Sequence, residues 1–529
     1  MNRFILFWCC AIAIVTACSC QHDAATPISK SGFIQLKDNH FQIDGEDFFP
    51  MMLNYIPSFQ SDSEGHFIVA PHVDYDSVAY VEAKGKEAVA RQLDGHFQLV
   101  EELGFNTLRI CFDRMSEDEN GRFFYKADRR FYIDNQDDAE AILAGVADLL
   151  ACAERHHLHV MLLIKPPMDN ASIRDFTIRM LKKFRHNQSI FAYDFMNEPL
   201  YFDPAEKRAK TDARAIVEKW RKLMRKYAPY HLFTIGFSEP LEVFEWDPSI
   251  LPVDFVEVHT YHPLRVPSEI YWYAHYIGKP WMIGETGLPA DNDSISYLEQ
   301  RSFMVETYQL VRDAGGAGFG WWEFQELTGT HFEATHTGLL NHEGRTVTAD
   351  GKHEIYGTLK PAAACLKSLS HYSPRPMELP SNYYNMMGYR NICITGTIID
   401  EQTGKGVEGA VIRGWNQYWS IGMNTYSDQN GHFTLFCNDE CVHFEISAPG
   451  MSHQKFNKQV ALSTTDHQPF NVQLLENRNL EYHQISYHPF LKVKDIHGHG
   501  YRILQFDPDL FTHYTWTGDL GVIPLKKLK

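Results

Sequence analysis

Two glutamates stand at the ends of short apolar runs that are typical of buried strands. Glu198 follows the run Phe191–Asn197 in the sequence Asn-Glu-Pro, and Glu285 ends the run Pro280–Glu285 before Thr-Gly. An ionised carboxylate is costly to bury without a partner, so this placement indicates a chemical role. Two carboxyl groups about 5–5.5 Å apart can hydrolyse a glycosidic bond with retention, because one protonates the leaving oxygen while the other attacks the anomeric carbon.

A parallel sheet closed into a barrel would bring both strand ends to one face of the protein. Short apolar runs alternate with longer amphipathic stretches over residues 33–372, which predicts strands and helices in turn. The strands are expected at Phe48–Asn54, Asn106–Phe112, Leu158–Ile164, Phe191–Asn197, Leu232–Phe237, Asp254–His259, Pro280–Glu285 and Ala317–Glu323. The helices are expected at Glu87–Leu103, Asp138–Arg155, Ile173–Arg185, Ala205–Tyr227, Ser294–Asp313 and His353–Ser370.

This pattern predicts a (β/α)8 TIM barrel as the catalytic domain, with Glu198 on the fourth strand and Glu285 on the seventh. A doubly wound open sheet is the alternative, but no glycine-rich phosphate loop follows the first strand. Long segments follow the first and eighth strands, at residues 56–86 and 324–352. We expect both on the carboxyl-end face of the barrel, walling a cleft.

The order and strand positions of Asn197-Glu198 and Glu285 resemble glycoside hydrolase clan A, and are most similar to family 5, the cellulase and mannanase group. The resemblance implies that Glu198 is the acid/base and Glu285 the nucleophile of a retaining, double-displacement hydrolase. It also implies a β-glucan or β-mannan type polysaccharide or oligosaccharide as substrate. No cofactor and no metal is expected.

Further positions match the family pattern. Arg109, in Gly-Phe-Asn-Thr-Leu-Arg, resembles the second-strand arginine that braces the nucleophile, since a guanidinium can hold a carboxylate ionised. His259 and Tyr261 resemble the sixth-strand pair that lines the cleft. Trp322, rather than Trp321, resembles the aromatic platform for the sugar in the cleaved subsite.

One position departs from the family. Lys165 stands at the end of the third strand, where the family usually has a histidine that contacts sugar. This departure weakens any assignment of substrate by resemblance. Glu239, in Ser-Glu-Pro, imitates the Asn-Glu-Pro motif but is expected to be structural, and Glu257 fits burial with a partner as well as a function.

The amino-terminal segment reads as an export signal. A basic start precedes the apolar run Phe4–Thr16, and Val15-Thr16-Ala17-Cys18 resembles a bacterial lipobox. The resemblance implies a lipoprotein signal peptide at 1–17, a lipid on Cys18, a tether at 18–32 and a place in the bacterial cell envelope. Cleavage before Cys20, or ordinary signal peptidase cleavage nearby, is the alternative.

The carboxyl-terminal third differs from the barrel. Residues 373–390 contain three prolines between Ser373 and Leu379-Pro380 and predict a linker that crosses few contacts. Residues 391–476 predict a small antiparallel β-sandwich, and "ITGTIIDEQTGKGVEGAVI" resembles the carboxypeptidase-regulatory-like domain. Residues 477–529 form an extension that the pattern does not assign. Cys437 and Cys441 could pair or stay buried as free thiols.

The net charge of −18 disfavours nucleic acid as a partner, because phosphate binding needs a basic surface. A neutral carbohydrate substrate and a monomer are expected. Two alternatives remain at this point: an exo-acting clan A β-glycosidase, and a glycan-binding lipoprotein without turnover.

Overall fold

The computed structural model covers the 529-residue chain and describes residues 30–75, 85–205, 207–261, 263, 265–293, 295–329, 335–380, 383, 392–419, 422–437, 440–464, 493–495, 501–503 and 516–528. The expected signal peptide and Cys18 lie outside the described residues. Within the part that is described, no helix is long and apolar enough to cross a bilayer.

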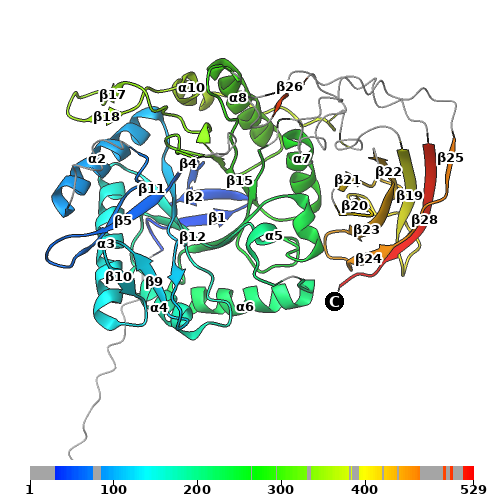
Figure 1. Cartoon of the computed structure of the whole chain (residues 1–529), viewed down its shortest axis with the longest axis horizontal. Helices are drawn as coiled ribbons and strands as arrows, with labels where there is room; N and C mark the ends of the chain where they lie inside the picture. Colours follow the sequence, from blue (N-terminus) through cyan, green and yellow to red (C-terminus); the bar gives the residue numbers. More distant parts are fainter. Residues whose placement is uncertain are drawn as a thin grey trace, which may run out of the picture.

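Eight parallel strands form the predicted barrel (Figure 1). In chain order they are β4 (Met51–Tyr55), β7 (Thr107–Cys111), β11 (His159–Leu163), β12 (Ile190–Asn197), β13 (Leu232–Phe237), β14 (Val256–His259), β15 (Trp281–Glu285) and β16 (Phe319–Trp321). Two backbone hydrogen bonds, from Ala317 to Trp281 and from Ile283 to Gly318, join the ends of the series and close it. The TIM-barrel prediction is confirmed, with Glu198 and Glu285 at the ends of the fourth and seventh strands.

Helices surround the barrel where amphipathic stretches predicted most of them. They are α2 (Lys86–Leu103), α3 (Gln136–Arg155), α4 (Ala171–Lys183), α6 (Lys210–Tyr227), α7 (Val266–Tyr276), α8 (Tyr297–Asp313) and α10 (Pro361–Leu369), with the short α5 (Pro199–Phe202) and the 3-10 turn η1 (Pro240–Phe244) at the carboxyl-end rim. Local caps fix their starts: Asn135 caps α3, and Ser296 forms a reciprocal capping box with Glu299 at α8.

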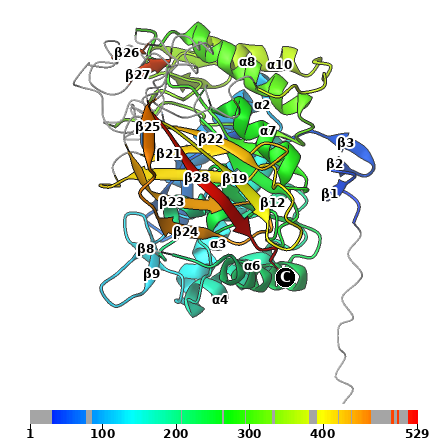
Figure 2. The same ribbon diagram turned by 90° about the vertical axis from the view of Figure 1, so that its right-hand side faces the viewer.

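A three-stranded antiparallel sheet covers the amino end of the barrel. It consists of β1 (Ile34–Lys37), β2 (His40–Ile43) and β3 (Glu46–Phe48), and projects from the barrel at the right of Figure 2. Phe41 is fully buried, with its ring centroid 4.9 Å from that of Phe191 and 5.1 Å from that of Phe255. This apolar plug leaves the carboxyl-end face as the open side.

The segment after the first strand forms a hairpin of β5 (Pro57–Ser61) and β6 (Phe67–Pro71). Phe67 is buried against Tyr125 of β9 (Phe123–Lys126). Phe59 packs on Tyr125 and also lines a cavity with His72 and Lys165, which both line the cleft as well. The expectation that this loop walls the cleft therefore holds for Phe59 and His72, and not for the buried Phe67.

The carboxyl-terminal part contains two four-stranded sheets. One has the order β22-β19-β28-β25 and the other β21-β20-β23-β24. Their strands are β19 (Ile392–Asp400), β20 (Val411–Asn416), β21 (Gly422–Tyr426), β22 (His432–Cys437), β23 (Cys441–Ser447), β24 (Gln454–Asn457), β25 (Leu462–Thr464) and β28 (Trp516–Leu525). All pairs are antiparallel except β19 with β28, which is parallel. β28 comes from the segment that the sequence pattern left unassigned.

The sheet β21-β20-β23-β24 docks against the barrel beside α5 and α7 (Figure 1). The indole N–H of Trp272 donates to the Gly409 carbonyl at 2.8 Å, and Lys210 donates to the Ala448 carbonyl at 3.1 Å. Tyr426 is fully buried and belongs to the same apolar core as the barrel helices. The expected sparse contact between the two parts is therefore wrong, because the sandwich completes a shared core.

Cys437 and Cys441 do not form a disulfide bond in the structure. Both are buried in the sandwich core, and their sulfur atoms lie 3.1 Å apart across the β22–β23 turn. This distance exceeds that of a disulfide bond, about 2.05 Å.

Candidate active site

Glu198 begins the turn that follows β12. Its backbone has φ 40° and ψ 72°, and its N–H donates to the Gly236 carbonyl at 2.7 Å. The turn is supported from η1, because the buried Glu242 accepts from the Leu200 N–H at 3.0 Å and from the Ser238 hydroxyl at 3.1 Å. These contacts hold α5, and with it Glu198, against the neighbouring strand.

Glu285 ends β15 and lies opposite Glu198 across the barrel mouth. One carboxylate oxygen of each lies within 4.8 Å of the other and of a ring nitrogen of His259. Glu285 accepts from the Arg109 guanidinium through Oε1 and from the Tyr261 hydroxyl through Oε2. Both oxygens are thus held in place.

Arg109 lies beneath the two glutamates with no exposed surface. Besides Glu285, its guanidinium reaches Asp194 at 2.7 Å and Glu257 at 3.0 Å, and it donates to the amide oxygens of Asn54 at 3.0 Å and Asn197 at 2.9 Å. Every guanidinium nitrogen has an acceptor, so the charge is fixed in one orientation. Because Asn197 accepts through its oxygen, its amide N–H groups are left to face the cleft.

His259 connects Glu198 and Glu285 to the buried charged groups around Arg109. Its Nδ1 lies 3.0 Å from Glu198 Oε1 and 3.6 Å from Glu285 Oε1, and its Nε2 lies 3.5 Å from Glu257. Burial alone would lower the pKa of His259, but the Glu285 charge and the hydrogen bonds to Glu198 and Glu257 raise it to about 10. The imidazole is therefore positively charged at neutral pH.

The same charges act on the carboxylates. Burial would raise the pKa of Glu285, but His259 and Arg109 together with the Tyr261 hydrogen bond outweigh burial and lower it. Asp194 behaves in the opposite way, because burial and the neighbouring Glu257 raise its pKa to about 7 against the effect of Arg109. Glu285 is therefore the carboxylate that its surroundings keep ionised.

A cleft of about 540 Å³ opens over the pair. Trp322 lines it, whereas Trp321 is fully buried and donates its indole N–H to the Thr337 carbonyl at 3.2 Å. Lys165 lines the cleft with Asp113. Burial raises the pKa of Asp113, and the charges of Arg109 and Lys165 oppose the rise.

The structure thus brings together all eight residues that the sequence selected, which are Arg109, Lys165, Asn197, Glu198, His259, Tyr261, Glu285 and Trp322.

Sequence reasoning missed part of this site. Asn54 and Asp194 bind Arg109, and the buried Glu323 accepts from the Tyr75 hydroxyl at 2.8 Å. Burial raises the pKa of Glu323 well above its usual range, and the hydrogen bond from Tyr75 only partly offsets this. Asp194 could have been found from the sequence, because it is a charged residue inside an otherwise apolar strand.

Glu239 is engaged away from the cleft. Arg265 lies 2.6 Å from its Oε1, and the Tyr201 hydroxyl donates to it at 2.7 Å. Burial opposes ionisation, but Arg265 and Tyr201 lower the pKa of Glu239 overall. An ion-paired carboxylate of this kind fits the structural role expected from the sequence.

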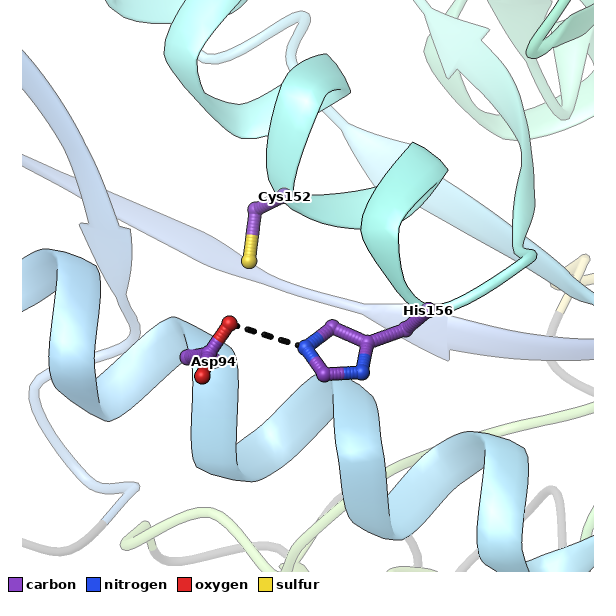
Figure 3. A group of neighbouring side chains, drawn as sticks. All are labelled: Asp94, Cys152 and His156. Carbon is purple, nitrogen blue, oxygen red and sulfur yellow. Dashed lines mark hydrogen bonds and ion pairs between the residues drawn. The ribbon is translucent and has the colours of Figure 1, made fainter.

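Two groups of side chains in the described residues have ligand atoms close enough to hold a metal. One is the Glu198, His259 and Glu285 group, where a protonated imidazole presents N–H rather than a lone pair. The other is Asp94, Cys152 and His156, between α2 and α3 (Figure 3). Asp94 there pairs with His156 at 2.9 Å and with Arg155 at 3.1 Å, and burial raises the pKa of the Cys152 thiol to about 12. The contacts of Asp94 with Arg155 and His156 are enough to explain why these side chains lie together.

No protein-family model matches the chain, and no curated protein sequence matches it. Solved structures with a similar fold include the endo-1,4-β-mannanase from Rhizomucor miehei, with 16% identity over 55% of this chain and 90% of that chain and a TM-score of 0.37. Another is the exo-β-1,4-mannosidase Op5Man5 from Opitutaceae bacterium strain TAV5, with 15% identity over 65% and 62% and a TM-score of 0.43. The β-glucosidase from Thermotoga maritima is 10% identical over 61% and 97%, with a TM-score of 0.40. At these values the similarity concerns the fold alone.

Proposed function

We propose that this protein is a retaining glycoside hydrolase in which Glu285 is the nucleophile and Glu198 the acid/base. The observation that carries the proposal is that carboxylate oxygens of Glu198 and Glu285 lie within 4.8 Å of each other. Retaining enzymes place the two carboxyl groups about 5–5.5 Å apart, whereas inverting enzymes need about 6.5–9.5 Å to admit a water molecule. The spacing therefore supports double displacement.

The environments of the two carboxylates support their separate roles. Arg109 and Tyr261 hold both oxygens of Glu285 and keep it ionised, as a nucleophile requires. Glu198 is half-buried, and its Oε1 lies 3.0 Å from Nδ1 of His259. This contact fixes the Glu198 carboxyl group at the edge of the cleft, where it can donate a proton to a leaving oxygen.

We propose a β-glucan or β-mannan type substrate, on the resemblance of the Asn197-Glu198 and Glu285 segments to clan A, family 5. Trp322 in the cleft supplies an aromatic face for a sugar ring, and Asn197 supplies amide N–H donors. Lys165 and Asp113 add charged groups to the same wall. A series of oligosaccharide products would indicate endo action, and a single monosaccharide would indicate exo action.

The deciding experiment combines activity with rescue of the nucleophile. Wild-type protein is assayed on β-1,4-mannan, mixed-linkage β-glucan and carboxymethyl cellulose, and on the 4-nitrophenyl β-glycosides of mannose and glucose. Glu285→Ala should lose nearly all turnover, and added azide should restore cleavage of the aryl glycoside with inverted product stereochemistry. A Glu285→Ala variant that keeps wild-type activity, or a folded wild type inactive on every substrate, would overturn the proposal.

We also propose that the chain is attached to a bacterial membrane through a lipid on Cys18. The support is the Val15-Thr16-Ala17-Cys18 sequence, which lies outside the described residues. Cells expressing the full chain would be labelled with a radioactive fatty acid and fractionated. The wild type should carry label in the membrane fraction, and Cys18→Ala should carry none.

A further inference from the structure

The strand β20 leads from the middle of the barrel wall toward the catalytic face. Gly409, two residues before β20, lies against Trp272 and Tyr276, in the second half of α7. A barrel helix runs from the carboxyl-end face toward the amino end, so this contact is far below the catalytic rim. Four residues on, Arg413 lies in the part of the sheet that contacts η1, which starts directly after β13 at that rim.

The carboxyl-terminal end of β20 is the tip of this strand, and it lies near the rim, because Arg413 acts electrostatically on Glu239 there. In Figure 2 the neighbouring strands β21 and β23 lie toward the side away from β1–β3, which cover the amino end. The later residues of β20 thus lie on the open-face side of the barrel.

Aromatic side chains gather at this tip, on the sheet face that meets the barrel. Trp415 shares the face of Val411, which is part of the barrel core, and it pairs across the sheet with His443. The Trp419 ring stacks on His443 with centroids 4.0 Å apart at 11°, and lies 6.1 Å from the Trp415 ring. Trp419 is nevertheless 46% exposed. One face of the indole is stacked on His443, and the flexible Lys455 side chain lies over the ring with Nζ 5.3 Å from the centroid.

The tip lies on the Glu198 side of the cleft. Phe202, on the turn that follows Glu198, is 63% exposed and lines the cleft. Its neighbour Tyr201 binds Glu239, the residue directly before η1. The path from the cleft to Trp419 therefore passes over α5 and η1. In a retaining hydrolase the leaving-group sugars lie on the acid/base side, because that residue protonates the departing oxygen.

We propose that Trp419 forms a binding platform for the leaving-group portion of a β-linked sugar chain, so that the carboxyl-terminal sandwich extends the catalytic cleft. The inference rests on the proposed hydrolase function and adds a second domain to the substrate site. A pyranose ring has an apolar C–H face that packs on an indole, and a side chain already held by stacking loses little entropy on binding.

The experiment compares a long substrate with a short one. Trp419→Ala is assayed on whichever of mannohexaose or cellohexaose the wild type cleaves, and on the matching 4-nitrophenyl β-glycoside, which has no leaving-group sugars. We expect kcat/KM for the hexaose to fall about tenfold, mainly through KM, and the aryl glycoside value to stay within twofold. Trp419→Phe should recover part of the loss.

Trp516→Ala is the matched control. Trp516 is 41% exposed and lies at the start of β28, in the other sheet of the sandwich. Its removal should therefore leave kcat/KM unchanged for both substrates. If Trp419→Ala lowers kcat/KM equally for the hexaose and the aryl glycoside, or leaves kcat/KM for the hexaose unchanged, Trp419 is not a binding platform. Either result would leave the hydrolase proposal intact. A wild type that cleaves neither substrate class would overturn both.

Discussion

Nδ1 of His259 lies 3.0 Å from Oε1 of Glu198, so the proposed acid/base shares a hydrogen bond with a buried, positively charged imidazole. The charge on His259 depends on Glu285 and Glu257 as well, which places one cation among three carboxylates. The protonation of His259 should therefore affect the stability of the fold.

His259 makes the folded state sensitive to alkaline pH. Its pKa rises from the ordinary 6.5 to about 10, so the stability it contributes is fully present below pH 6.5 and is lost as pH rises toward 10. Thermal unfolding of the wild type from pH 6 to 10.5 should show this loss. In His259→Asn the side chain cannot be protonated, so the melting temperature should depend less on pH between pH 6 and 10.5. Parallel curves for the two proteins would contradict the assigned charge.

Glu198→Ala should separate the two chemical steps. Natural glycans need a proton on the leaving alcohol, so their turnover should fall by about 10²–10⁴. A 4-nitrophenyl β-glycoside has a good leaving group and should still glycosylate Glu285, after which hydrolysis stalls without its base. Stopped-flow absorbance should show a burst of nitrophenol and a slow steady state. Equal losses on both substrates without a burst would mean that Glu198 only positions the sugar, and Glu239 would be the first alternative to test.

Gly284→Ala should disrupt the buried ion network. A Cβ at this position would lie 2.1 Å from Glu257 Oε1 and 2.2 Å from Glu257 Cγ, and Glu257 would have to leave Arg109. We expect a loss of about 1–3 kcal/mol in unfolding free energy and a larger loss of activity, since Glu285 is the next residue. Denaturant unfolding and aryl glycoside turnover measure the two effects. Wild-type values for both would show that the strand has room to move.

Truncation after Ser373 should destabilise the barrel. It would remove the acceptors of Trp272 and Lys210 and expose the core surface now covered by Tyr426. Loss of one or two buried large side chains costs several kcal/mol, so we expect the melting temperature to fall by at least about 5 °C, or the fragment to aggregate. Differential scanning calorimetry of the truncated and full-length chains is the measurement. An unchanged melting temperature would mean that the interface contributes little.

The sequence alone determined the barrel and the positions of the catalytic candidates. Each strand is a short apolar run buried on both faces, and each is separated from the next by a helix-length amphipathic stretch, so local pattern was enough to place all eight strands. Glu198 and Glu285 were visible because a charged residue at the end of such a run is unusual.

Only the tertiary structure decided what surrounds these two residues. The partners of Arg109 come from β4, β12, β14 and β15, and no spacing along the chain reveals that Asn54 and Asp194 reach one guanidinium. β28 joins β19 across more than a hundred residues, and the sandwich shares a core with α7. Such contacts depend on how separate elements pack, whereas local periodicity records only which face of each element is buried.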